Sequence, residues 1–132
     1  MASLEGLTGF LAYFVAALAA EAIFLTVYTL ITPYSEMKLI RAGNAAAAVS
    51  LGGAVLGFTL PLASAIAHSV SFLDFTLWAG VALVVQLVAY FIVALALGGV
   101  ARRIVDGDVA AGAALGTASL SVGILNAACM TY

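Results

Sequence analysis

Four long apolar segments, separated by short polar ones, make up almost the whole chain. No charged residue occurs within residues 42–73, 75–101 or 109–132, and a fourth segment, about residues 7–31, is interrupted only by Glu21. Each segment reaches or exceeds the roughly 20 apolar residues that a helix needs to cross a bilayer. The segments are continuously apolar, whereas the strands of a membrane barrel alternate in polarity over about ten residues. The pattern therefore predicts an all-α membrane protein with four transmembrane helices.

The second and fourth apolar segments resemble each other, which indicates an internal repeat. Residues 43–66 align with residues 107–130 without a gap. Identical residues meet at Gly43, Ala46, Ala47, Leu51, Gly52, Ala54, Leu56 and Ala63. Each copy follows a short basic segment, and each is preceded by a long apolar run with one polar residue near its middle, Glu21 or Gln86. The chain is thus interpreted as one two-helix unit used twice.

Composition and charge agree with the membrane class. The 132 residues are 66% hydrophobic and 8% charged, whereas soluble domains carry about 25% charged residues. The net charge of −2 predicts no nucleic-acid partner. The single cysteine, Cys129, excludes an internal disulfide. We expect no metal and no cofactor, because neither a second histidine nor a cysteine at ligand spacing accompanies His68.

The basic residues predict the orientation, since Lys and Arg near the ends of spans are kept on the cytoplasmic side. They lie in the first and third connections: Lys38, Arg41, Arg102 and Arg103. Both termini are therefore expected in the periplasm. Residues 1–132 should form one integral membrane domain of two tandem parallel units, at about residues 7–70 and 74–131, related by an axis along the membrane normal.

Glu21 is the most unusual residue of the pattern, because it lies near the middle of the first span. An ionised acid at the centre of a span costs about 2.5–3.5 kcal/mol. Two interpretations stay open: a protonated side chain that hydrogen-bonds between helices, or a group that faces water, a cation or a proton path in an assembly. Gln86 occupies the corresponding place in the third span, and we expect a hydrogen bond between Glu21 and Gln86 across the repeat axis.

Two further polar residues complete the candidate ion or proton site, which comprises Glu21, Gln86, His68 and Asn126. His68 is the only side chain whose unperturbed pKa is close to neutrality. The competing interpretation of His68 is an interfacial histidine that hydrogen-bonds to a neighbouring loop.

Small residues line one face of the second span and one face of the fourth. They are Gly53, Gly57 and Ser64 on the second span, and Gly112, Gly116, Ser119 and Gly123 on the fourth. In hydrocarbon, helices associate by close backbone approach, which Gly-x-x-x-Gly spacings favour. We expect these faces to be packing seams, with pore lining as the alternative.

The connection after Pro33 is short and amphipathic. We expect it to lie at the cytoplasmic interface, with Met37, Leu39 and Ile40 toward lipid or protein and its two basic residues toward headgroups or water.

Motifs spread along the chain resemble those of one known family. They are Ile31-Thr32-Pro33, Glu36, Leu39-Ile40, Asn44, Leu60-Pro61-Leu62, Ser64-Ala65, Ala82-Leu83, Gln86-Leu87 and the closing Asn126-Ala127-Ala128-Cys129-Met130-Thr131. The pattern is similar to that of the YjfL-like inner membrane proteins, domain-of-unknown-function family 350 of the UPF0719 type. The resemblance implies a multi-pass protein of the bacterial inner (plasma) membrane with a duplicated two-helix unit and no established activity. It also implies envelope-stress proteins as candidate partners.

These features bear on three classes of function. The first is an oligomerising structural or interaction subunit of the bacterial envelope, whose partners are membrane lipids, further copies of the chain or a larger membrane complex. The alternative is a small homo-oligomeric ion or proton channel, in which several copies bring a ring of Glu21 side chains together. An enzyme is not expected, because the polar residues are scattered in depth and no His-Glu-x-x-His, Gly-x-Ser-x-Gly or Cys-x-x-Cys motif occurs.

Overall fold

Six helices form the described part of the protein, residues 2–130, in a computed structural model. They are α1 (Ala2–Ile31), α2 (Glu36–Arg41), α3 (Ala45–His68), α4 (Phe72–Leu97), α5 (Val100–Val105) and α6 (Val109–Ala128). The helices α1, α3, α4 and α6 are long and apolar enough to cross a membrane. The predicted all-α class with four spans is therefore confirmed. Thr131, which closes both the predicted second unit and the family motif, lies outside the described residues.

Turns and caps of the same kind start the second and fourth spans. The Oδ1 atom of Asn44 accepts a hydrogen bond from the amide of Ala47 at 3.0 Å. The carboxylate of Asp108 accepts hydrogen bonds from two amides of the first turn of α6, at 3.1 and 3.4 Å. Just before each cap, the chain turns through a glycine with positive φ, Gly43 at +87° and Gly107 at +84°, a conformation that only glycine adopts readily. Local sequence thus fixes where α3 and α6 begin.

The helices α1 and α4 run parallel to each other. The ring of Tyr13 lies 5.6 Å from that of Phe75 near the starts of the two helices. Further along both, the ring of Tyr28 lies 5.2 Å from that of Tyr90. The contacts therefore advance in the same direction along the two helices.

The helices α3 and α6 also run parallel, and they form the tightest contact of the fold. A Cβ atom at Gly53 would overlap the backbone of Gly116, and one at Gly123 would overlap the carbonyl group of Gly57. Only residues without a side chain permit so close an approach. This contact, which we call the α3–α6 seam, joins the first half of the chain to the second.

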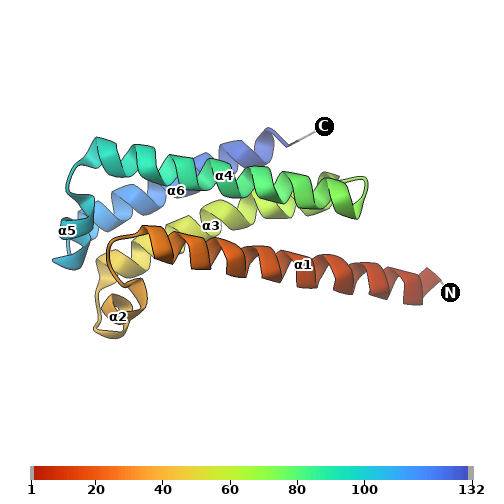
Figure 1. The fold of residues 1–132 in the computed structure, drawn as a ribbon, viewed down its shortest axis with the longest axis horizontal. Coiled ribbons are helices and arrows are strands. Elements are labelled where there is room, and N and C mark those ends of the chain that lie inside the picture. The colour runs from red at the N-terminus through yellow and green to blue at the C-terminus, as the bar shows by residue number, and fades with distance from the viewer. Residues whose placement is uncertain (1, 131–132) are drawn as a thin grey trace.

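The short helices and the chain termini lie at opposite ends of the long helices (Figure 1). The basic residues Lys38 and Arg41 are exposed on α2, and Arg102 and Arg103 are exposed on α5. All of them therefore lie at the same end, opposite the termini. Which side of the membrane this end faces stays a prediction.

Helix α1 is held by a few aromatic contacts and is otherwise loosely packed. Phe24 stacks on Phe58 of α3 with 4.7 Å between ring centroids, and both side chains are buried. Much of the rest of α1 exposes large apolar side chains, such as Leu7 and Phe10. In a membrane, this surface must meet lipid or another protein.

Candidate functional site

Polar side chains associated with α1 gather at two places: in a groove around Glu21 and in a buried cluster around Glu36. The groove lies between α1 and α3 and has a volume of about 350 Å³. Within it, Oε1 of Glu21 accepts a hydrogen bond from the hydroxyl of Thr59 at 2.8 Å. That hydroxyl also lies 2.7 Å from the carbonyl oxygen of Val55, so the two acceptors compete for one proton. Thr59 is the only hydrogen-bonding partner of Glu21 among the described residues.

The rest of the groove around Glu21 is apolar. Phe14, Leu18 and Leu62 line it on the two helices. Glu21 itself is half-buried and its partner Thr59 is exposed. The carboxyl group thus lies at the edge of the molecule, at the depth of a membrane span.

The predicted hydrogen bond between Glu21 and Gln86 is wrong. Gln86 is buried in α4, and its amide nitrogen donates to the carbonyl oxygen of Ser119 in α6 at 3.1 Å. Its amide oxygen lies 3.4 Å from Nδ2 of Asn126, which donates to it. The reason is the direction in which each long helix presents its polar residue: α1 turns Glu21 toward α3, whereas α4 turns Gln86 toward α6. Each polar residue therefore bonds to the other long helix of its own half.

His68 lies at the end of α3, in a third polar interaction. Its Nδ1 atom is 2.9 Å from the carbonyl oxygen of Ser64, one turn earlier. The hydroxyl of Ser64 donates to the carbonyl oxygen of Ala127 in α6 at 2.9 Å. The four candidate residues thus belong to separate interactions, of which only Gln86 and Asn126 share one. Within residues 2–130, no group of three His, Cys, Asp or Glu side chains could hold a metal ion.

The small residues of α3 and α6 all lie at the α3–α6 seam. Gly57 lies against the backbone of Ser119, and Gly112 lies against that of Ala46. Gly116 faces the carbonyl oxygen of Val49. Backbone meets backbone along this contact, which leaves no room for a water-filled path between α3 and α6.

The second polar place is a buried cluster that the sequence pattern does not single out. Glu36, the first residue of α2, is 1% exposed, and neither of its carboxyl oxygens has a hydrogen-bonding partner among the described residues. The hydroxyl oxygens of Tyr28, Tyr34 and Ser50 are buried, and none of them has a hydrogen bond of good geometry to another residue within 2–130. Buried polar groups in native proteins nearly always have partners. We call these four residues, together with Tyr90, the Glu36 cluster.

The Glu36 cluster draws its members from five parts of the fold, of which α2 contributes Glu36 itself. Tyr28 belongs to α1, Tyr34 to the loop after it, Ser50 to α3 and Tyr90 to α4. Ser50 is a close neighbour of both Tyr28 and Tyr34, and Glu36 interacts electrostatically with all three tyrosines. The cluster therefore lies where the C-terminal end of α1 meets the rest of the bundle.

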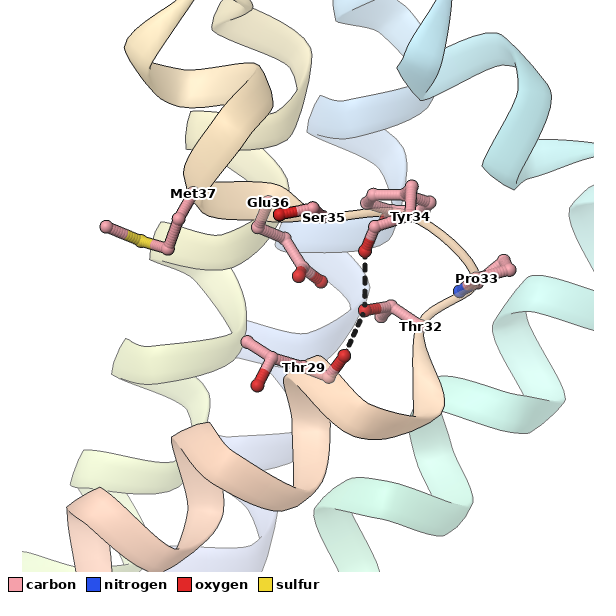
Figure 2. A pocket seen from close by; sticks show the side chains of 7 residues that line it. All are labelled: Thr29, Thr32, Pro33, Tyr34, Ser35, Glu36 and Met37. Atoms are coloured by element: carbon pink, nitrogen blue, oxygen red, sulfur yellow. Dashed lines mark hydrogen bonds between the residues drawn. The ribbon is translucent and has the colours of Figure 1, made fainter.

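An open pocket of about 520 Å³ leads to Glu36. Figure 2 shows the carboxyl group of Glu36 directed toward Thr29 and Thr32, in the space between the start of α2 and the last turn of α1. The hydroxyl of Thr32 lies 3.3 Å from the carbonyl oxygen of Thr29 and 3.4 Å from that of Tyr34. Pro33, which has no amide hydrogen, cannot satisfy the carbonyl group of Thr29 as a continuing helix would.

Burial determines the protonation of the cluster. It raises the pKa of the Glu36 carboxyl above the ordinary value of 4.5, and the nearby Thr32 hydroxyl lowers that pKa by less. Burial also raises the pKa of Tyr34, and the neighbouring Tyr90 and Glu36 add to this increase. No basic side chain forms an ion pair with Glu36, since the ion pair found within residues 2–130 joins Arg103 to Asp108. Glu36 is therefore stable in this place either as a neutral acid or beside a bound cation.

Comparisons with known proteins find relatives along the whole chain. A family model described as Domain of Unknown Function (DUF350) matches residues 1–130. The chain is 43% identical over 129 residues to the "UPF0719 inner membrane protein YjfL" of Escherichia coli (strain K12), covering 98% of each chain. It is 35% identical over 81 residues to the "UPF0719 transmembrane protein YshE" of Bacillus subtilis (strain 168), covering 61% of this chain and 60% of that one. No solved structure matches the chain. The family resemblance seen in the motifs is confirmed.

Proposed function

The chain belongs to the DUF350 family and is a multi-pass inner membrane protein, and from this premise we propose that it is an oligomerising structural or interaction subunit of the bacterial envelope. Copies of the chain meet along the groove between α1 and α3. Glu21 is the observation that carries this proposal, because Thr59 is the one partner that its carboxyl group has within residues 2–130, at the depth of the span. An acid in contact with hydrocarbon is costly, and a second copy that brings its own Glu21 and Thr59 supplies further hydrogen bonds.

The loose packing of α1 supports a protein partner on this side. Leu7, Phe14 and Leu18 are each about half-exposed on α1, near the groove or on the turns leading to it. Helices in lipid associate through packing contacts and interhelical hydrogen bonds, since lipid tails are as apolar as leucine. A second copy along the groove provides both kinds of contact at once.

We also propose that the fold is a tandem repeat with periplasmic termini, at about residues 7–70 and 74–131. Each half contains a long helix, a six-residue helix with exposed basic residues and a second long helix, in the same order. The parallel pairs α1/α4 and α3/α6 support the same reading. Because the basic helices α2 and α5 lie at one end, the positive-inside rule places that end in the cytoplasm.

A cation or proton conductor formed between copies is the second candidate function. Glu21 and Thr59 favour it because both face outward from the single chain. A ring of copies would place several carboxyl groups around one axis, which is a known way to select cations. The conducting path would lie between copies, since the α3–α6 seam is closed by backbone contacts.

A catalytic role is not part of the proposal. Glu21, His68 and Asn126 take part in separate hydrogen bonds, whereas catalysis requires polar groups that converge on one point. Envelope-stress proteins and a larger membrane complex stay proposed partners. Co-purification from the native membrane, followed by mass spectrometry, tests them.

Substitution of Glu21 separates the two candidate functions. We expect native mass spectrometry to show an oligomer for the wild type and for Glu21→Gln, because the amide still hydrogen-bonds between copies. Glu21→Leu, which removes the polar contact, should weaken assembly, and Glu5→Gln near the exposed start of α1 serves as the control. Cation or proton flux in liposomes that is present in the wild type and lost in Glu21→Gln would establish the conductor. A wild type that stays monomeric in lipid nanodiscs would contradict both functions.

A further inference from the structure

We propose that the Glu36 cluster binds one monovalent alkali cation, Na⁺ or K⁺, at the end of the bundle that carries α2 and α5. Five oxygen atoms of the cluster have no hydrogen bond of good geometry to any residue that the structure describes. They are both carboxyl oxygens of Glu36 and the hydroxyl oxygens of Tyr28, Tyr34 and Ser50. Glu36, Tyr28 and Ser50 are each 1% exposed, so bulk water does not satisfy them. Polar atoms that converge in a buried place without partners indicate a ligand that binds between them.

The chemistry of these atoms selects a hard cation. All of them are oxygens of carboxyl or hydroxyl groups, which are ligands for alkali and alkaline-earth ions, and no imidazole or thiol takes part. An anion is disfavoured, because Glu36 would repel it and no basic side chain within residues 2–130 pairs with Glu36.

The charge of the cluster selects a monovalent ion. Glu36 is its one carboxylate, and the other members are tyrosines and a serine, which are neutral near pH 7. A single positive charge therefore makes the occupied site neutral. A divalent ion would leave one uncompensated positive charge in a buried place, which is strongly unfavourable.

The end of α1 adds a second attraction for a cation. The last carbonyl groups of this 30-residue helix point toward the cluster end, and a helix C-terminus carries partial negative charge. No basic residue lies in the last turn of α1 to neutralise it. Pro33 also leaves the carbonyl group of Thr29 without the amide partner that a longer helix would provide.

The open pocket beside Glu36 gives an ion access to the cluster. Thr29, Thr32 and Glu36 lie on its wall, and Met37 points away from them (Figure 2). Its volume of about 520 Å³ is large enough for a hydrated ion to enter before losing water to the buried oxygens. The pocket lies at the C-terminal end of the α1 span, and most of its lining residues follow that span, so we expect the ion to enter from the aqueous side at this end.

Thermal unfolding and direct ion binding test the proposal. The purified protein in detergent would be unfolded in NaCl, in KCl and in N-methyl-D-glucamine chloride at equal ionic strength, and the binding of ²²Na⁺ would be measured by scintillation proximity. We expect a saturable rise in Tm in at least one alkali salt and no such rise in N-methyl-D-glucamine chloride. We also expect the protein to bind ²²Na⁺, and K⁺ should displace the bound ²²Na⁺ if K⁺ binds more tightly. A Tm that is the same in all three salts would overturn the proposal, because water or a proton would then satisfy the cluster.

Variants locate the site. Glu36→Gln should abolish both the salt-specific rise in Tm and the binding of ²²Na⁺. In N-methyl-D-glucamine chloride, the Tm of this variant should equal or exceed that of the wild type, which would show that the variant folds. Tyr34→Phe removes one hydroxyl and should weaken binding without abolishing it. Glu21→Gln is the matched control, since it makes the same chemical change elsewhere and should leave binding intact. Retained binding in Glu36→Gln, or binding lost equally in Glu21→Gln, would contradict the assignment to this cluster.

Discussion

Glu21 and Glu36 are the two acidic residues whose surroundings are least like water, and the interaction partner that each carboxyl group lacks is different. Among the described residues, Glu21 has one hydroxyl donor and an open apolar groove beside it, and we propose that a second copy of the chain supplies its further partner. Glu36 is buried, and its carboxyl oxygens have no hydrogen-bonding partner among the described residues, so what it lacks is a single positive charge or a proton. We therefore propose the first residue as a determinant of assembly and the second as a determinant of ion or proton binding.

The raised pKa of Glu36 predicts a pH-dependent stability in the absence of alkali cations. Because the folded protein binds this proton more tightly than the unfolded chain does, the stabilisation is complete below the ordinary pKa of 4.5 and is lost as pH rises through the raised value. The facing groups Tyr28, Tyr34 and Tyr90 stay neutral in this range. In N-methyl-D-glucamine buffers, the Tm of the wild type should fall with rising pH more steeply than that of Glu36→Gln. Equal slopes for the two proteins would contradict the burial of a titrating carboxyl group.

The close contact at the α3–α6 seam predicts that Gly→Ala substitutions at the seam and outside it have different effects on stability. Gly123→Ala places a Cβ into the carbonyl group of Gly57 and should destabilise the protein by about 1–3 kcal/mol, as overpacking does. Gly52→Ala is the control, because nothing lies within 4 Å of its added Cβ. The control should be neutral or up to about 1 kcal/mol more stable, since alanine is the better helix former. Unfolding by SDS in mixed micelles measures the stability of both variants. Equal stabilities of Gly123→Ala and Gly52→Ala would show that α3 and α6 can move apart at the seam without cost.

At the scale of the element, Asn44 joins the start of α3 to the end of α5. Its Oδ1 atom caps the amide of Ala47, while its Nδ2 atom donates to the carbonyl oxygen of Ile104 at 2.8 Å. Asn44→Asp keeps the capping acceptor and loses the donor, so it should cost about 1 kcal/mol, whereas Asn44→Ala should cost about twice as much. The same unfolding assay distinguishes them.

The corresponding cap of α6 provides the control for this prediction. Asp108→Asn keeps an acceptor for the first turn and removes only an exposed ion pair with Arg103. Exposed ion pairs contribute little to stability, so this change should be nearly neutral. If Asp108→Asn destabilised the protein as strongly as Asn44→Asp, the link to α5 would not be the cause.

The elements could be predicted from the sequence more fully than the site. A span in lipid must satisfy its own backbone, so a long uncharged apolar run determines a helix with little dependence on its neighbours. The partner of Gln86 could not be predicted in the same way, because it depends on how α4 is rotated against α6. The sequence marks Glu36 only as part of the family motif, because a six-residue amphipathic segment does not show which of its faces other helices will cover. The one local signal was the row of hydroxyl side chains before it, Thr32, Tyr34 and Ser35.

At the scale of the whole molecule, the placement of the termini predicts the pattern of chemical labelling. Cys129 is exposed at the end that carries the termini, and Asp106 is exposed at the opposite end. If the basic end is cytoplasmic, a membrane-impermeant maleimide should label Cys129 in intact spheroplasts. Asp106→Cys, in a Cys129→Ser background, should be labelled only after permeabilisation. The reverse pattern would show that the termini face the cytoplasm.

The pairing of α3 with α6 also sets the order in which the protein can be completed. The partner of α3 is α6, which follows it only after α4 and α5, so the glycine face of α3 enters the membrane before α6 is available to cover it. The spans α1, α3 and α4 must wait in the bilayer, or beside the insertion machinery, until α6 has been made. A chain that stops before residue 109 would contain the four basic residues that set its orientation but would lack α6. We expect a membrane protease to degrade such a chain as an incompletely folded protein.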